Sequence, residues 1–308
     1  MFSVSDSQKK LKNPTGVTVG TFDGVHRGHA LVAESLRKAC GERGLTPLAI
    51  TFEPHPLAVV APERAPRLLE NPRERESRLR EMGLEVEVLE FNDRLRAVTV
   101  DQWFGILRRD YNARLILLGY DNSFGSDGRG KSLDYFIEAG QRHGIEVKMA
   151  EELQGVSSSG IRAAIAAGRI KDANRMLGRE YCIEGRVVHG RAVGRELGFP
   201  TANVELDPAL LLPPKGVYAA DVDAGDGSIY RSVVNIGKAP TFSDNIPLTL
   251  EVHLLGFHGY LYGKNIKVKF IEKLRDEKKF ANLEELINAI KKDVTDAVKI
   301  DINHAPVI

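Results

Sequence analysis

Cysteine is scarce in this chain of 308 residues, which contains only Cys40 and Cys182. The two residues lie far apart, and neither belongs to a cluster of cysteine and histidine, so neither a disulfide framework nor a zinc site is expected. Each thiol is expected to be a small buried side chain. The cytoplasm, which keeps thiols reduced, is the expected location.

Long apolar runs and an excess of one charge are missing as well. No apolar stretch approaches the roughly 20 residues that a helix needs to cross a bilayer, and the N-terminal segment MFSVSDSQKKLKN lacks the apolar centre of a secretory signal. Lys and Arg number 43 and Asp and Glu 42, so the net charge is only +1. We therefore expect neither a nucleic acid nor a membrane as a partner.

What is present is ordinary for a globular protein, with 43% hydrophobic and 28% charged residues. The length is sufficient for about two domains. The pattern of the sequence changes once, near Gly178. We expect one domain over residues 1–178 and a second over residues 179–308.

Short apolar runs alternate with helical patterns in the first domain. Strands are predicted at Thr15–Gly20, Leu45–Phe52, Glu85–Phe91, Ala113–Gly119 and Ile145–Met149, with helices from about Gly28, Val100 and Lys131. This alternation predicts an α/β domain with a doubly wound, mostly parallel sheet, in which ligands bind beyond the carboxyl ends of the strands. The charged segment Pro62–Arg80 is expected to be an exposed connection leading into a solvated helix.

Strand-like runs follow one another directly in the second domain. They cover Tyr181–Val188, Gly216–Val222, Ile229–Ile236, Thr249–Leu254 and Lys264–Ile271, and a helix is predicted at about Leu283–Val298. Serial short strands that end in one helix predict a small antiparallel β-barrel with a C-terminal helix packed against it.

The segment G-T-F-D-G-V-H-R-G-H, residues 20–29, follows the first predicted strand and opens the first predicted helix. His26 and His29 share one face of the first turn. A helix N-terminus favours anions, and Gly24 and Gly28 allow the backbone to come close to a phosphate. A tight turn with two surface histidines would explain the pair alone, but the whole segment at this junction favours a phosphate site.

Three more polar segments follow later strands: Thr51–Pro56, Gly119–Gly125 and Ser157–Arg162. The serines of the last segment can cap a helix, and together with Arg162 they can also clamp a phosphate. Taken alone, that segment leaves both interpretations open. Because all of these segments are expected at one edge of the sheet, we favour a ligand site there.

Residues 125–132, G-S-D-G-R-G-K-S, match the P-loop pattern and make a P-loop kinase an alternative. The preceding strand is expected to end near Gly119, several residues too early for the tight junction of a P-loop. No later strand ends in a clear metal-binding aspartate, and the histidine pair would have no role. We therefore disfavour this alternative.

The second domain contains a glycine-rich run, G-R-V-V-H-G-R-A-V-G-R-E-L-G-F-P-T-A-N, over residues 185–203. Its glycines allow a loop to fold over phosphates. Thr201 and Asn203 offer neutral oxygens that suit a hard cation such as Mg²⁺. A β-turn followed by a strand would explain P-T-A-N on its own.

The motifs of the first domain resemble the nucleotidyltransferase signature of bacterial FAD synthetases. The resemblance rests on G-T-F-D-G-V-H-R-G-H, on T-F-E-P-H-P and on the segment from Ser157 to Arg162. Thr21 and Ser159 replace the Asn and Thr that the family usually has. Asn122 and Ser123 depart from the family's pattern in the loop after the fourth strand.

The glycine-rich run of the second domain resembles the riboflavin kinase signature of the same enzymes. Further similar segments follow, among them Glu251-Val-His253 and Leu274-Arg275. The resemblance extends over about residues 15–298, which is nearly the whole chain.

The resemblance implies a bifunctional enzyme that makes FMN from riboflavin and then FAD from FMN, using ATP twice. Glu251 would be the general base of the kinase reaction. His26, His29 and Arg162 would stabilise phosphate charge during adenylyl transfer, which releases pyrophosphate. ATP, riboflavin and FMN would be the substrates, and Mg²⁺ the cofactor.

The resemblance also assigns binding roles. It implies nucleotide contacts at Gly20, Phe22, Gly24, Gly28, Asp121, Ser157, Ser158, Ser159, Gly190, Gly194, Arg195 and Pro200. It implies flavin contacts at Phe52, Pro54, His55, Pro56, Asn235 and Arg275, and metal contacts at Thr201 and Asn203. His55 could equally cap a loop, Asp23 could be purely structural, and Arg275 could be a surface arginine.

A protein that binds flavin without making both cofactors could carry part of this pattern. One such protein is a nucleotidyltransferase whose kinase domain has become a flavin sensor, which the presence of Thr201, Asn203 and Glu251 disfavours. Another is a flavin carrier, which would not need the complete histidine motif.

Overall fold

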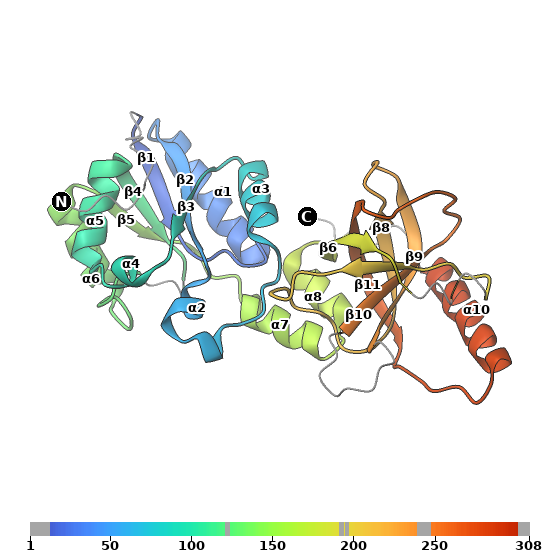
Figure 1. Cartoon of the computed structure of the whole chain (residues 1–308). Coiled ribbons are helices and arrows are strands. Elements are labelled where there is room, and N and C mark those ends of the chain that lie inside the picture. Colours follow the sequence, from blue (N-terminus) through green and yellow to red (C-terminus); the bar gives the residue numbers. More distant parts are fainter. Residues whose placement is uncertain (1–12, 121–123, 191–193, 195–196, 239–247, 301–308) are drawn as a thin grey trace. The chain divides into compact units, whose positions relative to one another are not determined.

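The computed structural model of the chain describes residues 13–120, 124–190, 194, 197–238 and 248–300 (Figure 1). Internal contacts divide the chain into two compact units, Met1–Val156 and Ser157–Ile308, and each is described by itself. The change of pattern in the sequence predicted a boundary at residue 178. The difference lies in two helices, α7 (Ser158–Ala166) and α8 (Ile170–Leu177), which belong to the second unit.

The first unit is built on a sheet in which all neighbouring strands are parallel. Its strands are β1 (Thr15–Val19), β2 (Thr46–Glu53), β3 (Glu85–Glu90), β4 (Ala113–Leu118) and β5 (Glu146–Met149), in the order β3-β2-β1-β4-β5 (Figure 1). All five predicted strands are present. The strand order reverses between β1 and β4, and the loops after these strands flank the crevice where such sheets bind ligands.

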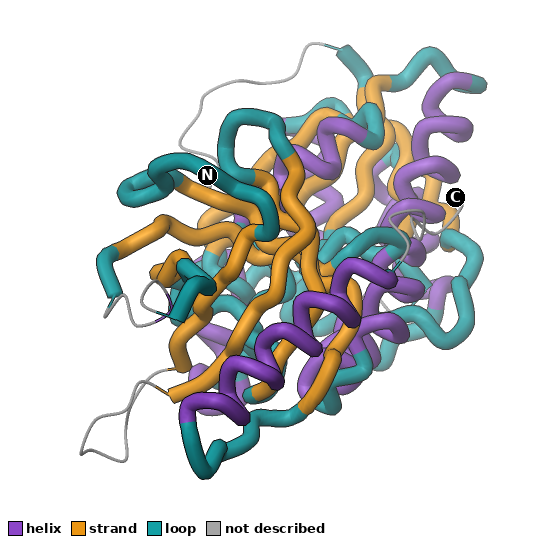
Figure 2. The backbone as a smooth tube through the Cα atoms, turned by 90° about the vertical axis from the view of Figure 1, so that its right-hand side faces the viewer, coloured by secondary structure: helices purple, strands orange, loops and turns teal. Residues whose placement is uncertain are grey.

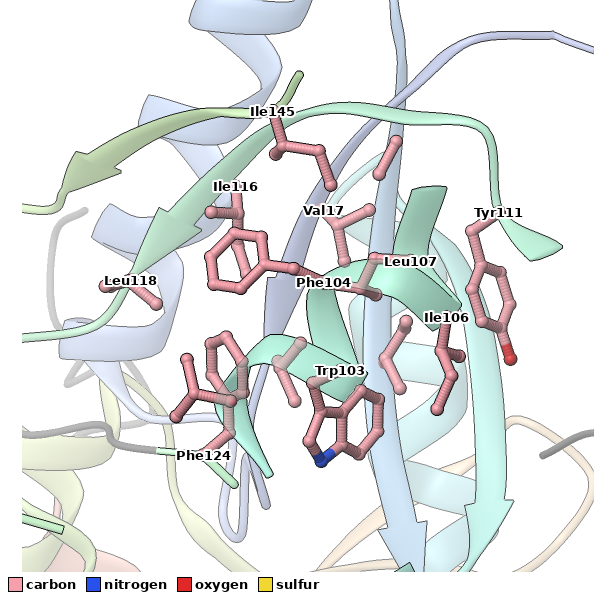
Figure 3. Packing of buried hydrophobic residues seen from close by; sticks show 14 of the residues in the cluster. Val17, Trp103, Phe104, Ile106, Leu107, Tyr111, Ile116, Leu118, Phe124 and Ile145 are labelled. Carbon is pink, nitrogen blue, oxygen red and sulfur yellow. The ribbon is translucent and has the colours of Figure 1, made fainter. Parts of the chain in front are cut away.

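Helices cover both faces of this sheet, which confirms the predicted doubly wound fold. Consecutive residues of β4 belong to different apolar clusters: Ile116 packs with Phe104, whereas Leu115 packs with Leu36 (Figure 3). One cluster packs on α5 (Val100–Asp110) and α6 (Leu133–His143), and the other packs on α1 (Arg27–Gly41) and α3 (Pro72–Glu81). Shorter helices lie at α2 (Pro56–Val60), η1 (Pro62–Arg64) and α4 (Asp93–Arg96).

The expectation of an exposed, solvated segment over Pro62–Arg80 was wrong in its central part. Leu69 and Leu79 are buried apolar residues, and Leu79 belongs to the cluster beneath α1. Glu70 and Arg75 are buried too, although they carry charge. The high content of Arg and Glu concealed this, because hydrophobic periodicity registers only the apolar positions of a helix.

The second unit is a closed antiparallel barrel of six strands, as the sequence predicted. Its order is β10-β7-β6-β11-β8-β9, closed by the pairing of β9 with β10. The strands are β6 (Tyr181–Val188), β7 (Ala202–Glu205), β8 (Gly216–Asp223), β9 (Ile229–Lys238), β10 (Leu248–Leu254) and β11 (Asn265–Arg275). Only β7 was not predicted, since it has four residues and follows directly on the P-T turn.

Helix α10 (Leu283–Lys299) packs on the outside of the barrel, and Figure 2 looks onto it with the strands behind. Ala297 is buried against Val217 and Val233 of the barrel. Arg231 donates hydrogen bonds to the carbonyl oxygens of Ala297 and Ile300, at 2.6 Å and 2.7 Å. A cation thus satisfies the carbonyls that the end of the helix leaves without intrahelical partners.

None of the helices in the described ranges is both long enough and apolar enough to cross a membrane.

Close packing around α6 yields a stability prediction. A Cβ added at Gly140 would lie 2.6 Å from the carbonyl oxygen of Ile145, whereas one added at Gly105 in α5 would meet only the His143 ring, at 3.5 Å. We expect Gly140→Ala to lower the free energy of unfolding by about 1–3 kcal/mol through overpacking. Gly105→Ala is the matched control and should leave stability unchanged or raise it by up to about 1 kcal/mol. Urea unfolding of both variants measures the difference, and equal effects would contradict the packing argument.

Candidate functional sites

The loop after β1 holds the two predicted histidines against each other. His26 is the N-cap of α1: its Nδ1 accepts from the N–H of His29 at 3.4 Å, and Nδ1 of His29 accepts from the N–H of His26 at 3.3 Å. The rings stack with centroids 3.6 Å apart. Because each Nδ1 accepts, each neutral ring carries its proton on Nε2, which makes Nε2 a donor suited to phosphate oxygens.

Backbone strain is concentrated in the same loop. Phe22, Gly24 and Val25 have positive φ angles of 48°, 82° and 30°. Such angles are costly for Phe and for β-branched Val, and strain of this kind clusters at ligand-binding sites. A Cβ at Gly28 would lie 3.1 Å from the His26 ring, so glycine lets that ring lie flat against the first turn.

The loop after β2 has a more structural character than predicted. The Phe52 ring is buried in the core against Phe91 and Trp103. His55 caps α2 by accepting from the N–H of Leu57 at 3.2 Å, and Pro56 is the first residue of that helix. Pro54, which follows a cis peptide bond, is exposed. Capping, the alternative left open for His55, is therefore confirmed, and its flavin contact stays a prediction.

The loop after β1 is also bonded to the end of strand β2. Thr51 donates through Oγ1 to the carbonyl oxygen of Thr21 at 3.2 Å, and the N–H of Gly20 donates to the carbonyl oxygen of Ile50 at 3.0 Å. The carboxyl ends of β1 and β2 therefore present the histidine motif and the E-P-H-P turn at the same edge of the sheet, as the sequence predicted.

In the loop after β4, the residues Asp121, Asn122 and Ser123 lie outside the described part of the chain. Its later part, the P-loop match, has a structural role. Asp127 accepts from the N–H of Val100 at the start of α5 and from the Tyr135 hydroxyl, both at 2.7 Å. Lys131 lies over the Tyr135 ring, 5.0 Å from its centroid.

The serine segment forms the start of α7 in the second unit. Ser157 is the N-cap and accepts from the N–H of Gly160 at 3.0 Å, so helix capping is confirmed. Ser158 and Ser159 occupy the first turn, and Arg162 is half-buried one turn later. The phosphate clamp stays a prediction.

The barrel brings three predicted site residues into one row. Glu251 on β10 pairs directly with Asn203 on β7 and with Asn235 on β9. Directly paired residues of antiparallel strands point to the same face, with Cβ atoms about 4.5–5.5 Å apart. The neighbours of Glu251 along the strand, Leu250 and Val252, are fully buried, so the row lies on the outer face of the barrel.

Burial raises the pKa of the Glu251 carboxyl above its ordinary value. Desolvation disfavours the charged form of the carboxyl and makes its ionised form a stronger base. A general base works best when its pKa approaches the operating pH. The direction of this shift therefore matches the predicted role of Glu251.

The glycine-rich loop packs against the P-T-A-N segment. A Cβ at Gly190 would overlap the Asn203 amide, and one at Gly194 would lie 3.2 Å from the Thr201 hydroxyl oxygen. Nδ1 of His253 lies 2.8 Å from the carbonyl oxygen of Pro200, which connects β10 to the same turn. Arg195 lies outside the described residues. Glycine at positions 190 and 194 thus allows the loop to approach the two predicted metal ligands.

Two contacts in the barrel were not anticipated. The Arg275 guanidinium, a predicted flavin contact, makes a bidentate bond to Asp293 of α10, with nitrogen–oxygen distances of 2.8–3.1 Å. Its flavin contact stays a prediction. His189 stacks on Tyr262 at 3.9 Å between centroids. The only sequence signal for this stack is that His189 directly precedes Gly190 within the glycine-rich run.

Within the described ranges, no three His, Cys, Asp or Glu side chains gather into a metal cluster. The predicted ligands of a cation in the barrel are the neutral oxygens of Thr201 and Asn203, which lie beside the Glu251 carboxylate. Hydroxyl, amide and carboxylate oxygens are ligands that hard divalent cations accept, with phosphate and water completing the shell. The donor set fits such a cation.

The raised pKa of Glu251 predicts a pH-dependent stability. Below the ordinary glutamate pKa of about 4.3, the carboxyl is neutral in both states; as the pH rises through the raised pKa of the folded state, stability is lost. Glu251→Gln should therefore be more stable than the unaltered chain at pH 7, and the difference should shrink as the pH falls toward the ordinary value. Melting temperatures over this pH range measure it, and identical values at pH 7 would contradict the effect of burial.

Comparison with known proteins agrees with the two predicted activities. The family model described as FAD synthetase matches residues 8–161, and the one described as riboflavin kinase matches residues 177–300. A bifunctional riboflavin kinase/FMN adenylyltransferase from Pseudomonas fluorescens is 41% identical over 285 residues, which cover 91% of each chain. The protein of the same description from Bacillus subtilis is 35% identical over 92% of this chain and 91% of its own.

A solved structure described as a macrolide-efflux protein from Streptococcus pneumoniae has a TM-score of 0.86 and 31% identity, covering 94% of this chain and 96% of its own. The same order of domains thus extends through full-length relatives. Because the two family models fall on the halves that hold the histidine loop and the glutamate row, the chain belongs to the family of bifunctional riboflavin kinase/FMN adenylyltransferases.

Proposed function

We propose that this chain phosphorylates riboflavin to FMN in its barrel and transfers the adenylyl group of a second ATP to FMN, which gives FAD and pyrophosphate. The observation that carries the proposal is the row of Asn203, Glu251 and Asn235, in which a carboxyl with a raised pKa lies between two amides. The stacked histidines at the start of α1 support the second reaction.

In the kinase reaction, Glu251 takes the proton of the terminal ribityl hydroxyl of riboflavin. The hydroxyl oxygen forms a bond to the γ-phosphorus of ATP, and the bond from that phosphorus to the β-phosphate oxygen breaks, releasing ADP. Catalysis of such a transfer is mostly positioning and neutralisation of charge. The half-buried setting of Glu251 keeps the base oriented, and Asn235 on the neighbouring strand supplies an amide to the flavin substrate.

Phosphoryl transfer from ATP implies a divalent cation, and we propose Mg²⁺. Thr201 and Asn203 would hold it, and it would neutralise charge on the ATP phosphates. Gly190 and Gly194 would let the glycine-rich loop fold over those phosphates. Arg195 and Pro200 would be further nucleotide contacts.

In the adenylyl transfer, a phosphate oxygen of FMN attacks the α-phosphorus of ATP, and the bond to the β-phosphate breaks. The nucleophile is already an anion, so no general base is needed. His26 and His29 donate from Nε2 to the triphosphate at the positive end of α1, whose first turn contains no acidic residue. We propose Arg162 as a further cation for the leaving pyrophosphate, and Gly20, Phe22, Gly24, Gly28, Asp121 and Ser157–Ser159 as the nucleotide contacts.

Competing functions are less well supported than this proposal. The description of the S. pneumoniae structure concerns macrolide efflux, but the likeness is one of fold, and both family models match flavin-cofactor enzymes. A carrier or a flavin sensor would not require a base with a raised pKa beside two cation ligands. We propose the cytoplasm as the location, because the sequence contains only two cysteines, which lie far apart.

The two activities should be separable in one chain. Glu251→Gln should lower FMN formation from riboflavin by at least about a hundredfold, because the general base is lost, and should still convert supplied FMN to FAD. His29→Ala should retain FMN formation and lower FAD formation by about 10²–10³-fold. Chromatography of the flavins over time, with riboflavin or FMN supplied, measures both. A variant that lost both activities while folded would count against two independent sites.

The P-loop alternative makes the opposite prediction at one residue. Lys131→Ala should leave both activities within about twofold, because Lys131 lies over Tyr135 in a loop that anchors α5. A P-loop kinase would lose nearly all phosphoryl transfer with this substitution, because its lysine binds the β- and γ-phosphates. The same flavin assay distinguishes the two outcomes.

A further inference from the structure

Arg75 of α3 has an unusual setting for an arginine. The residue is only 3% exposed, and Nη2 donates to the carbonyl oxygen of Phe52 at 2.9 Å. Phe52 is close to the end of β2, directly before the E-P-H-P turn. Nε of Arg75 has no hydrogen-bond partner within the part of the chain that the structure describes.

The charges of two buried carboxylates, Asp23 and Glu70, favour the ionised form of this guanidinium. Asp23, in the histidine loop, is 1% exposed and accepts from the N–H of Leu69 through both oxygens, at 3.0 Å and 3.3 Å. Glu70 is buried as well and pairs with Arg78 at 2.9 Å. Burial lowers the pKa of Arg75, and the charges of Asp23 and Glu70 oppose that effect. The side chain is a cation held among acids contributed by separate segments.

Stability alone is a poor explanation for this arrangement. Taking a charged side chain out of water costs free energy, and a buried Nε without a hydrogen-bond partner adds to that cost. Where such groups persist, the best-attested gain is a unique geometry. The geometry that Arg75 determines is that of the end of β2 relative to the Asp23 loop.

We propose that Arg75 is a positioning residue for adenylyl transfer, which keeps the turn after β2 and the histidine loop after β1 in fixed register. This role rests on the proposed function of the first unit. Arg75 is almost completely covered, so it acts through Phe52 and Asp23 and not on the substrate itself. Displacing reacting groups by about 1 Å can cost about a hundredfold in rate.

The test uses the full-length chain, with Arg75→Met, Arg75→Lys and the control Arg80→Met. Arg80 lies on the same helix and pairs with Glu76 on an exposed face, so its loss removes an arginine ion pair without touching the two loops. We expect Arg75→Met to lower kcat for FAD formation from FMN by about a hundredfold, with a smaller change in KM. Arg75→Lys should retain part of the kcat for FAD formation that Arg75→Met loses. Arg80→Met should have the same kcat as the unaltered chain.

The riboflavin kinase reaction of the same chain is the internal reference and should be unchanged in all three variants. The rate is expressed per folded first unit, measured from its unfolding transition. If Arg75→Met does not fold, Arg75→Lys decides, and a fivefold or greater loss of kcat in it supports the role. A kcat within twofold of the unaltered chain in the folded variant would overturn the role, as would equal loss in both reactions. If the unaltered chain made no FAD, the proposed function would fail, and the role of Arg75 with it.

Discussion

Backbone hydrogen bonding between neighbouring strands is the constraint on which both sites depend. In the barrel, the register of β10 between β7 and β9 places Glu251 opposite Asn203 and Asn235. A slip of one residue would turn Glu251 into the core and expose Leu250, which is fully buried. The apolar core therefore enforces the position of the Glu251 carboxyl. In the first unit, the parallel pairing of β1 and β2 brings the carboxyl ends of both strands, and the loops that follow them, to one edge of the sheet.

Charge that is partly or fully removed from water recurs in both units, and burial acts differently in each case. For Glu251, burial raises the pKa and produces a better base, at a cost in stability at neutral pH. For Arg75, burial disfavours the charged form, while Asp23 and Glu70 support it, so the guanidinium is held in one place. The distinction is the number of opposite charges nearby. Desolvation is the main cause of the pKa shift of both groups. Only for Arg75 do nearby carboxylates of opposite charge counteract it.

Much of the fold could be predicted because its strands are short apolar runs between turn residues, and ten of the eleven were predicted. The exception, β7, has only four residues, and its Asn203 is not part of the buried core. The histidine loop was predicted because helix start, glycines and histidines occur together in one segment. The row of Asn203, Glu251 and Asn235 could not be derived from spacing, because it depends on pairings between strands separated by loops of different length.

Several motif residues proved ambiguous for a physical reason. Phe52, Arg275 and Ser157 were assigned to ligands by resemblance, and the structure shows each in a structural contact: a core cluster, a bond to Asp293 and a helix cap. A motif residue can maintain a loop's shape as well as touch its ligand, and sequence alone does not separate the two. Arg75 is the converse case. Its charge predicted a solvated helix, and only the packing of Leu69 and Leu79 beside it shows that the segment is buried.

The chemistry of the two sites imposes an order on the reactions. Riboflavin ends in a neutral hydroxyl, which needs a base before it can attack phosphorus, and burial shifts the pKa of Glu251 in the direction that such a base requires. FMN ends in a phosphate, which is an anion already, and the start of α1 attracts anions through its dipole and two Nε2 donors. Riboflavin cannot take part in the adenylyl transfer, since it carries no phosphate oxygen to attack the α-phosphorus of ATP. The phosphate that the kinase reaction adds to riboflavin is the group that reacts in the adenylyl transfer. FMN therefore necessarily precedes FAD.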